Sequence, residues 1–168
     1  MPGRSTVKTG TPTLPLEDTA PMNALVSRIL LHSTRAPEFI DITDEVLAQV
    51  KESGAKDGLV CVYSKHTTAA IKINEHEPLL LKDMEEFLKR LAPADAYYGH
   101  NDFAIRTVHM EEQEPPNGHS HCSHLMLGTS ETIPLIAGEL QFGKWQRIFL
   151  VELDHPRPRE VLISILGV

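Results

Sequence analysis

The chain has few of the features that mark secreted, membrane or disulfide-bonded proteins. It contains only two cysteines, Cys61 and Cys122, in 168 residues, too few for a disulfide framework, so we expect reduced thiols. Its apolar runs, Leu79–Leu81 among them, are far too short to cross a bilayer. The segment Met1–Met22 lacks the apolar core of a secretory signal. Together these absences predict a cytoplasmic protein that has no membrane partner.

Positive charge is also scarce. Lysine and arginine number 16 against 23 acidic residues, which gives a formal net charge of −7. A nucleic-acid partner requires a clustered basic face, so none is expected. The chain also lacks a glycine-rich phosphate loop, a dinucleotide fingerprint and the paired CxxC or HExxH zinc signatures. Nucleotide binding of those kinds is therefore not predicted.

Hydrophobic periodicity predicts one α+β domain over residues 23–168, with mixed or antiparallel sheet layers and two or three helices. Residues 1–22 hold four prolines and no hydrophobic period, so they are predicted to be a flexible N-terminal tail. One helix should have Thr43 or Asp44 as its N-cap, with Val46, Leu47 and Val50 inward, and a second should span 78–91. The expected strands are 24–32, 39–42, 59–63, 69–74, 132–136, 140–142, 145–153 and 161–168, and residues 103–109 form a strand or an extended arm.

Histidine is the residue that the chain has in excess. Seven of the nine histidines fall between His66 and His124, and the run 117–124 alone holds His119, His121 and His124 beside Cys122. If the run is extended, His119 and His121 point the same way, whereas in a helix His121 and His124 share a face. Either geometry can supply two imidazoles to a zinc-like ion. The alternative is a polar loop that carries surface histidines.

Other candidate residues lie at predicted strand ends and turns. His66 follows an apolar strand, and a hairpin of the strands around it would bring Glu75, next to Asn74, close to its ring. His100 lies in a polar turn where a functional role and simple packing are equally open. Arg157 and Arg159 flank prolines in a turn, which suits planar recognition of phosphate or carboxylate, although solvated turn charges are the simpler explanation.

Several motifs together resemble the YjbQ family, in an order that runs from about residue 24 to 168. They are His66-Thr67-Thr68-Ala69, Asn74-Glu75, Asp83-Met84, Tyr98-Gly99-His100, His119-Ser120-His121, Thr132-Ile133-Pro134, Gly138-Glu139-Leu140, Gly143-Lys144-Trp145-Gln146 and Glu152-Leu153-Asp154. The resemblance implies a YjbQ-like α+β protomer over residues 23–168, assembled as a homotrimer. It also implies a secondary thiamine-phosphate synthase activity, which joins an aminopyrimidine diphosphate to a thiazole phosphate and releases pyrophosphate.

The resemblance also implies a polar set that falls on His66, Asn74, Glu75, Asp83, His100, His121, Glu152 and Arg159. For the synthase hypothesis, His66, Glu75, His100 and His121 are the expected catalytic residues, and Asn74, Asp83, Glu152, Arg157 and Arg159 are expected to bind substrate. Glu75, Asp83 or Glu152 could hold Mg²⁺ on the diphosphate, with Lys144 adding positive charge.

Two other hypotheses stay open. One is a zinc-dependent hydrolase with ligands drawn from His66, His100, His119 and His121, and with Glu75 activating water. The other is a non-catalytic trimer that binds a metal or a small phosphorylated or anionic metabolite. A divalent metal, Mg²⁺ or Zn²⁺, is thus an expected cofactor.

Overall fold

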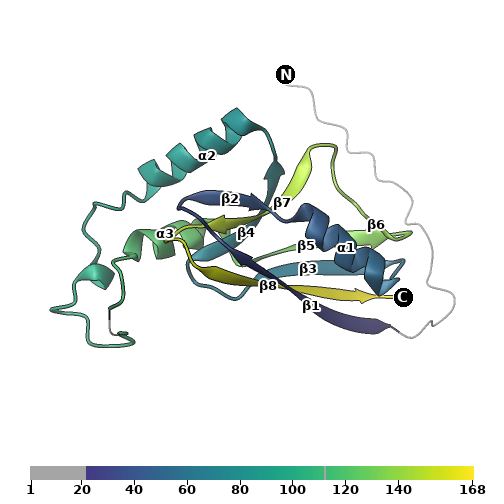
Figure 1. Ribbon diagram of the computed structural model, residues 1–168, viewed down its shortest axis with the longest axis horizontal. Coiled ribbons are helices and arrows are strands. Elements are labelled where there is room, and N and C mark those ends of the chain that lie inside the picture. Colours follow the sequence, from purple (N-terminus) through teal and green to yellow (C-terminus); the bar gives the residue numbers. More distant parts are fainter. Residues whose placement is uncertain (1–21, 112) are drawn as a thin grey trace, which may run out of the picture.

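Two antiparallel sheets form the framework (Figure 1). The structure is a computed structural model that describes residues 22–111 and 113–168, so the predicted tail lies outside the described residues except for Met22. A five-stranded sheet has the order β1-β8-β3-β5-β6 and a three-stranded sheet the order β2-β7-β4. The first comprises β1 (Asn23–His32), β8 (Pro158–Gly167), β3 (Gly58–Ser64), β5 (Ser130–Ile136) and β6 (Glu139–Leu140), and the second β2 (Glu38–Asp41), β7 (Gln146–Glu152) and β4 (Ala69–Glu75).

The core lies in two layers, one on each face of the three-stranded sheet. Between the sheets, Val60, Ile163 and Ile71 belong to a buried cluster that also includes Val46 of α1 (Thr43–Ser53). On the other face, Phe149, Val151 and Leu88 form a second cluster beneath α2 (Pro78–Leu91) and α3 (Gly118–Leu127). Because the three-stranded sheet is covered on both faces, its strands are apolar on both faces. The predicted α+β class is confirmed.

The first helix departs from its predicted start. Ile42 is the N-cap and has no capping side chain, while the Asp41 carboxylate accepts the Thr43 N–H at 2.9 Å. The acceptor is therefore supplied from one residue further upstream than a usual N-cap. Val46 and Val50 are buried as predicted, but Leu47 is 39% exposed. Gly54 ends the helix in the left-handed conformation at φ +70°.

The second helix has the predicted bounds, and its predicted apolar stripe is only partly covered. Glu77 is the N-cap, and its carboxylate accepts the N–H groups of Leu79 and Leu80, so the helix begins at Pro78. Leu88 is buried, whereas Phe87 remains 56% exposed. Figure 1 shows the reason, because α2 meets the rest of the molecule mainly at one edge of the three-stranded sheet.

The chain passes from one sheet to the other between β3 and β4. The predicted hairpin of these two strands is therefore wrong: β3 pairs with β5 and β8, and β4 pairs with β7. The crossing leaves Thr67 and Thr68 at the end of the molecule where β7 finishes, since Ala69 lies opposite Glu152. Glu75 lies opposite Gln146, about 20 Å further along the strand.

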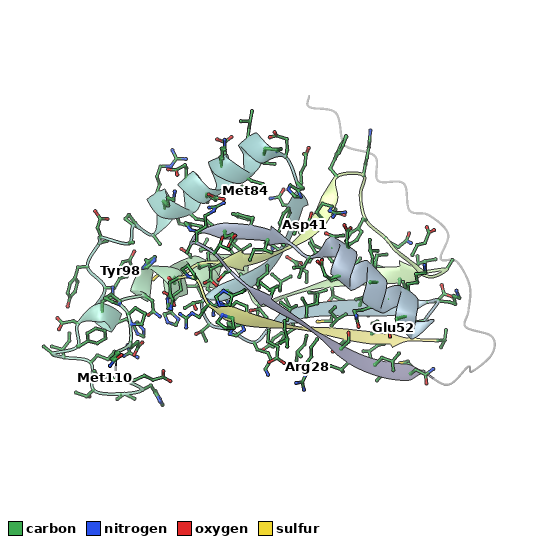
Figure 2. The ribbon with its side chains drawn as sticks, in the orientation of Figure 1. Arg28, Asp41, Glu52, Met84, Tyr98 and Met110 are labelled. Carbon is green, nitrogen blue, oxygen red and sulfur yellow. The ribbon has the colours of Figure 1, made fainter. Side chains whose placement is uncertain are left out.

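The run rich in histidine is helical, so the helical alternative holds. Asn117 occupies the N-cap of α3 but makes no capping hydrogen bond. Residues 103–109, predicted as a strand or an extended arm, instead form turns and bends that follow the short 3-10 helix η1 (Gly99–Asn101). Figure 2 places Tyr98 and Met110 on this projecting arm. Among the described residues, no helix is long and apolar enough to span a membrane.

Candidate functional site

A cleft of about 470 Å³ opens where the arm, the start of α3 and the β7–β8 turn meet. Its position follows from the sheet crossing, which brings the β3–β4 link to the same end as the last residues of β7. Thr67 and Thr68 contribute one wall, and His121 and Asn117 contribute another from α3. Residues far apart in the sequence thus line one hollow.

Two of the predicted histidines face each other in the cleft. The rings of His100 and His121 are 4.7 Å apart in an edge-on arrangement. Burial, followed by the nearby positive groups His100, His124 and Arg106, lowers the pKa of His121 below its usual value. His121 is therefore neutral near pH 7 and can take up a proton when an anion arrives.

Arg106 organises the arm above these rings. Its guanidinium donates to the Glu114 carboxylate at 2.8 Å, to the His100 carbonyl at 3.3 Å and to the His100 Nε2 atom at 3.2 Å. It also donates to the His109 carbonyl at 2.5 Å. With these acceptors satisfied, Arg106 holds the arm in place and has little capacity left for a ligand.

The cation best placed for a ligand is Arg157, in the β7–β8 turn. Its guanidinium pairs with Asp154, whose side chain is only 3% exposed, and lies 3.3 Å from the His155 Nδ1 atom. Asn117 also donates to Asp154, at 3.3 Å. Arg157, His155 and Asn117 all line the cleft, so one buried carboxylate holds three of its walls. The Arg157 Nε and Asn117 Oδ1 atoms have no hydrogen-bond partner in the described part of the chain.

Glu152 and Arg159, predicted to bind substrate, form a buried ion pair behind the cleft. Their side chains are 0% and 2% exposed. Arg159 Nε donates to Glu152 at 2.6 Å and its Nη2 donates to the Thr68 hydroxyl at 3.1 Å. Glu152 further accepts the Ser33 hydroxyl at 2.8 Å. Because both side chains are almost completely enclosed and bonded to each other, the pair supports Thr68 from behind the cleft.

His66 does not line the cleft, and one of its ring nitrogens is already used. Its Nε2 atom accepts the Glu160 backbone N–H at 2.9 Å, so Nδ1 carries the proton in the neutral ring. Burial, and then the positive charge of Arg159, lowers the pKa of His66. His66 thus lies next to the buried ion pair, apart from the facing rings of His100 and His121.

The remaining predicted residues are distributed away from the cleft. His119 lies on the opposite side of α3 from His121 and borders a separate cavity. Asn74 donates to the Met84 sulfur at 3.2 Å, and Glu75 follows it at the far end of β4. Asp83 is exposed on α2. Within one chain, these three residues of the predicted polar set do not join the histidines.

A divalent cation needs several ligand side chains that converge on one point. Over residues 22–111 and 113–168, no group of three or more His, Cys, Asp or Glu side chains converges as metal ligands would. Of the predicted Mg²⁺ ligands, Glu152 is enclosed in its ion pair and Glu75 lies at the other end of β4. The predicted zinc ligands are also separated. His100 and His121 lie in the cleft, His119 lies on the opposite side of α3, and His66 accepts the Glu160 N–H. The residues of a single chain therefore do not fit a resident Mg²⁺ or Zn²⁺ ion.

The structure adds site residues that the sequence reasoning missed. Arg106, Glu114 and His155 line the cleft, and Asp154 anchors it. In the sequence, the only sign of an Arg106–Glu114 pair is that two opposite charges lie eight residues apart. A strand over 103–109, as predicted, would have held these two side chains away from each other. In the sequence, Asp154 was singled out only as the last residue of the motif Glu152-Leu153-Asp154.

Comparisons with known proteins agree with this fold. A family model described as UPF0047 protein YjbQ-like matches residues 27–168. A UPF0047 protein of Methanothermobacter thermautotrophicus is 40% identical over 146 residues, which cover 87% of this chain and 94% of that protein. The crystal structure of a YbjQ-like protein of unknown function from Sulfolobus solfataricus P2 is 36% identical with a TM-score of 0.79, covering 88% of this chain and 99% of that one. A hypothetical protein from Aeropyrum pernix K1 is 33% identical with a TM-score of 0.77, covering 86% and 99%.

Proposed function

Because the chain belongs to the UPF0047 protein YjbQ-like family, we propose that it is a transferase of the thiamine-phosphate synthase type. The reaction joins an aminopyrimidine diphosphate to a thiazole phosphate and releases pyrophosphate. The proposal combines the activity implied by the sequence motifs with the chemistry of the cleft, because the relatives' names state no activity.

The reaction depends more on the stabilisation of charge than on covalent catalysis by the protein. The bond between the pyrimidine methylene carbon and the diphosphate oxygen breaks, and its electron pair leaves with the diphosphate. The lone pair of the thiazole nitrogen then forms the new carbon–nitrogen bond. Catalysis therefore consists of holding the two reactants in line and neutralising the departing diphosphate.

The observation that carries the proposal is the grouping of Arg157, His100 and His121 in one cleft. Arg157 offers a planar cation to a phosphate, and its buried Nε donor has no partner within the described residues. His121, which is neutral near pH 7, can accept a proton as the diphosphate binds and share it with the diphosphate. Thr67 and Thr68 add backbone and hydroxyl donors on the opposite wall. Because the residues of a single chain do not fit a resident metal ion, the cationic side chains of the cleft supply the positive charge that neutralises the diphosphate.

The test is a direct assay for thiamine phosphate with both phosphorylated reactants saturating. We expect product from the wild type, and we expect Arg157→Gln to lower kcat by about 100-fold, as the loss of one preorganised charge does elsewhere. Arg157→Lys should recover part of this loss because it keeps the charge without the planar donor set. The matched control is Arg90→Gln, which removes an exposed arginine of α2 and should leave kcat unchanged.

Each variant is compared with the wild type by its thermal unfolding midpoint, so that a folding defect is separated from a catalytic one. Turnover by the wild type no faster than the uncatalysed rate would rule the synthase function out. Equal kcat in the wild type and Arg157→Gln would remove Arg157 from the mechanism.

We also propose that the working unit is a homotrimer in the cytoplasm. The outer face of the five-stranded sheet supports association because it carries exposed apolar side chains, among them Val26 at 66%, Leu30 at 77% and Leu59 at 48%. Exposed apolar side chains gathered on one sheet face favour an interaction site. The two unpaired cysteines support a reducing compartment.

A further inference from the structure

One buried serine that no sequence motif singled out lies directly behind the turn between β7 and β8. Ser33 follows the last residue of β1 and is 1% exposed. The antiparallel pairing of β1 with β8 places His32 opposite Pro158. The chain just after β1 therefore runs beside the residue just before β8, which is Arg157. Ser33 can thus contact Arg157 although 124 residues separate them in the sequence.

Ser33 holds both polar groups of the Arg157 backbone. The Ser33 N–H donates to the Arg157 carbonyl at 3.2 Å. The Ser33 hydroxyl oxygen accepts the Arg157 N–H at 3.0 Å and lies 3.2 Å from the same carbonyl. Because two backbone groups of one residue are bonded to one partner, the position from which the Arg157 side chain extends is fixed by Ser33.

The same hydroxyl connects Arg157 to the buried pair of Glu152 and Arg159. A hydroxyl has a single proton, and the Ser33 Oγ atom lies 2.8 Å from the Glu152 carboxylate, closer than to the Arg157 carbonyl. Arg159 donates from the other side of this pair to the Thr68 hydroxyl at 3.1 Å. Two walls of the cleft, Thr68 and Arg157, are therefore tied to one buried ion pair, and Ser33 is the link to Arg157.

The guanidinium of Arg157 is held separately, by Asp154. The two side chains form an ion pair, and the Asp154 N–H donates to Glu152 at 3.0 Å. The Arg157 side chain is 35% exposed and lines the cleft, so it is available to a ligand while its backbone is fixed. Fixing an arginine before a ligand arrives reduces the conformational entropy that binding costs. Loss of the Ser33 hydroxyl should therefore loosen Arg157 without changing the charge of the cleft.

We propose that Ser33 is a positioning residue for anion binding: its hydroxyl fixes the backbone of Arg157, so that the guanidinium meets an anionic ligand in one geometry. This role rests on the proposed function in one respect, because it takes Arg157 as the cation that binds the diphosphate. Ser33 does not line the cleft. It therefore acts through Arg157 and not on the ligand itself.

The test is a double-mutant cycle, measured by isothermal titration of the full-length protein with inorganic pyrophosphate. Ser33→Ala should weaken binding about fivefold, the effect of one lost hydrogen bond, and Arg157→Gln should weaken it about tenfold or more. In the Arg157→Gln background, Ser33→Ala should have no further effect, because the side chain through which Ser33 acts is gone.

The matched control is Ser27→Ala, which also removes a hydroxyl from the β1 segment. The Ser27 Oγ atom is buried and has no hydrogen-bond partner within the described residues, so this variant should bind pyrophosphate like the wild type. The thermal unfolding midpoint separates positioning from a general structural role. Ser33→Ala should lower the midpoint equally in both backgrounds, because Gln at position 157 keeps the backbone groups that Ser33 holds.

Three outcomes would overturn the positioning role. They are a wild type that does not bind pyrophosphate, equal affinity of the wild type and Ser33→Ala, and an equal weakening by Ser33→Ala with and without Arg157. The synthase reaction is judged separately, by the product assay. A protein that shows the expected coupling between Ser33 and Arg157 but forms no thiamine phosphate would overturn the proposed function alone.

Discussion

At the residue scale, four histidines share one electrostatic feature, a lowered pKa. They lie on α3 or near the crossing between the two sheets. Burial is the largest cause that lowers the pKa of His66, His119, His121 and His124 below the usual value of 6.5. The folded protein therefore holds these rings neutral under conditions in which the unfolded chain would already bind protons.

This difference predicts a loss of stability in weak acid. Above about pH 7 both states are neutral at these positions, so the histidines add no pH dependence. As the pH falls below about 6.5, the unfolded state binds more protons and the free energy of unfolding decreases. Urea denaturation at pH 7.5, 6.5 and 5.5 should show this decrease, and His119→Gln should reduce its slope.

Between pH 7.5 and 5.5, the effect of the histidines on stability is separated from that of a carboxylate such as Asp41. Burial alone would raise the pKa of Asp41, but hydrogen bonds from Arg147, Thr43 and His76 outweigh it and lower the pKa to about 2. Asp41 therefore loses its contribution only below about pH 4. His32→Gln, at an exposed position of β1, is the control. Stability that is flat or rises between pH 7.5 and 5.5 would contradict the prediction.

At the scale of the element, the position of α3 depends on one close approach. A Cβ atom on Gly118 would lie 2.6 Å from the Tyr98 Cβ atom and 2.8 Å from its Cγ atom. The Gly118 N–H also donates to the Asn101 side chain at 2.8 Å, which ties the start of α3 to η1. Since His100 belongs to η1 and His121 to α3, this contact sets the distance between the two rings.

Gly118→Ala should therefore destabilise the protein, although alanine is normally the better helix residue. We expect a loss of about 1–3 kcal/mol from overpacking, which exceeds the helix gain of at most about 1 kcal/mol. Urea denaturation measures it, and the product assay should show a lower kcat because the rings move apart.

Gly99→Ala is the matched control, because a Cβ atom on Gly99 meets nothing within 4 Å. If Gly118→Ala and Gly99→Ala are equally stable, the close approach of α3 to Tyr98 does not constrain the fold.

For the whole molecule, the outer sheet face determines the expected assembly. Light scattering after size exclusion should give a trimer for the wild type. Leu30→Asp should shift it to the monomer, because a carboxylate buried in an apolar interface lacks a partner. Leu79→Asp is the control at 66% exposure on α2, away from this face. A monomeric wild type, or a trimer that Leu30→Asp leaves intact, would contradict the proposed interface.

Much of the fold was predictable because it follows from local patterns. The bounds of α2 were predicted correctly from Pro78 and the apolar repeat, and most strands came from alternation. Errors arose where a contact from elsewhere decided the outcome, as at Leu47, which stays exposed, and at residues 103–109, which Arg106 gathers into turns. Periodicity reports which side of an element is apolar, and it does not report what lies opposite.

The sequence by itself determined the residue types of the site and two of its elements: the strand link at Thr67 and Thr68, and the arginine turn. It left the run 117–124 open between an extended segment, a helix and a polar loop, and the structure decided for the helix that carries His121. Only the tertiary structure decided which of them meet. It joined His100 with His121 and Arg157, enclosed Glu152 and Arg159 as a supporting pair, and left Glu75 at the other end of β4. The physical reason is that burial and proximity depend on which sheet each strand enters, and the crossing between β3 and β4 is a long-range packing outcome that no local pattern encodes.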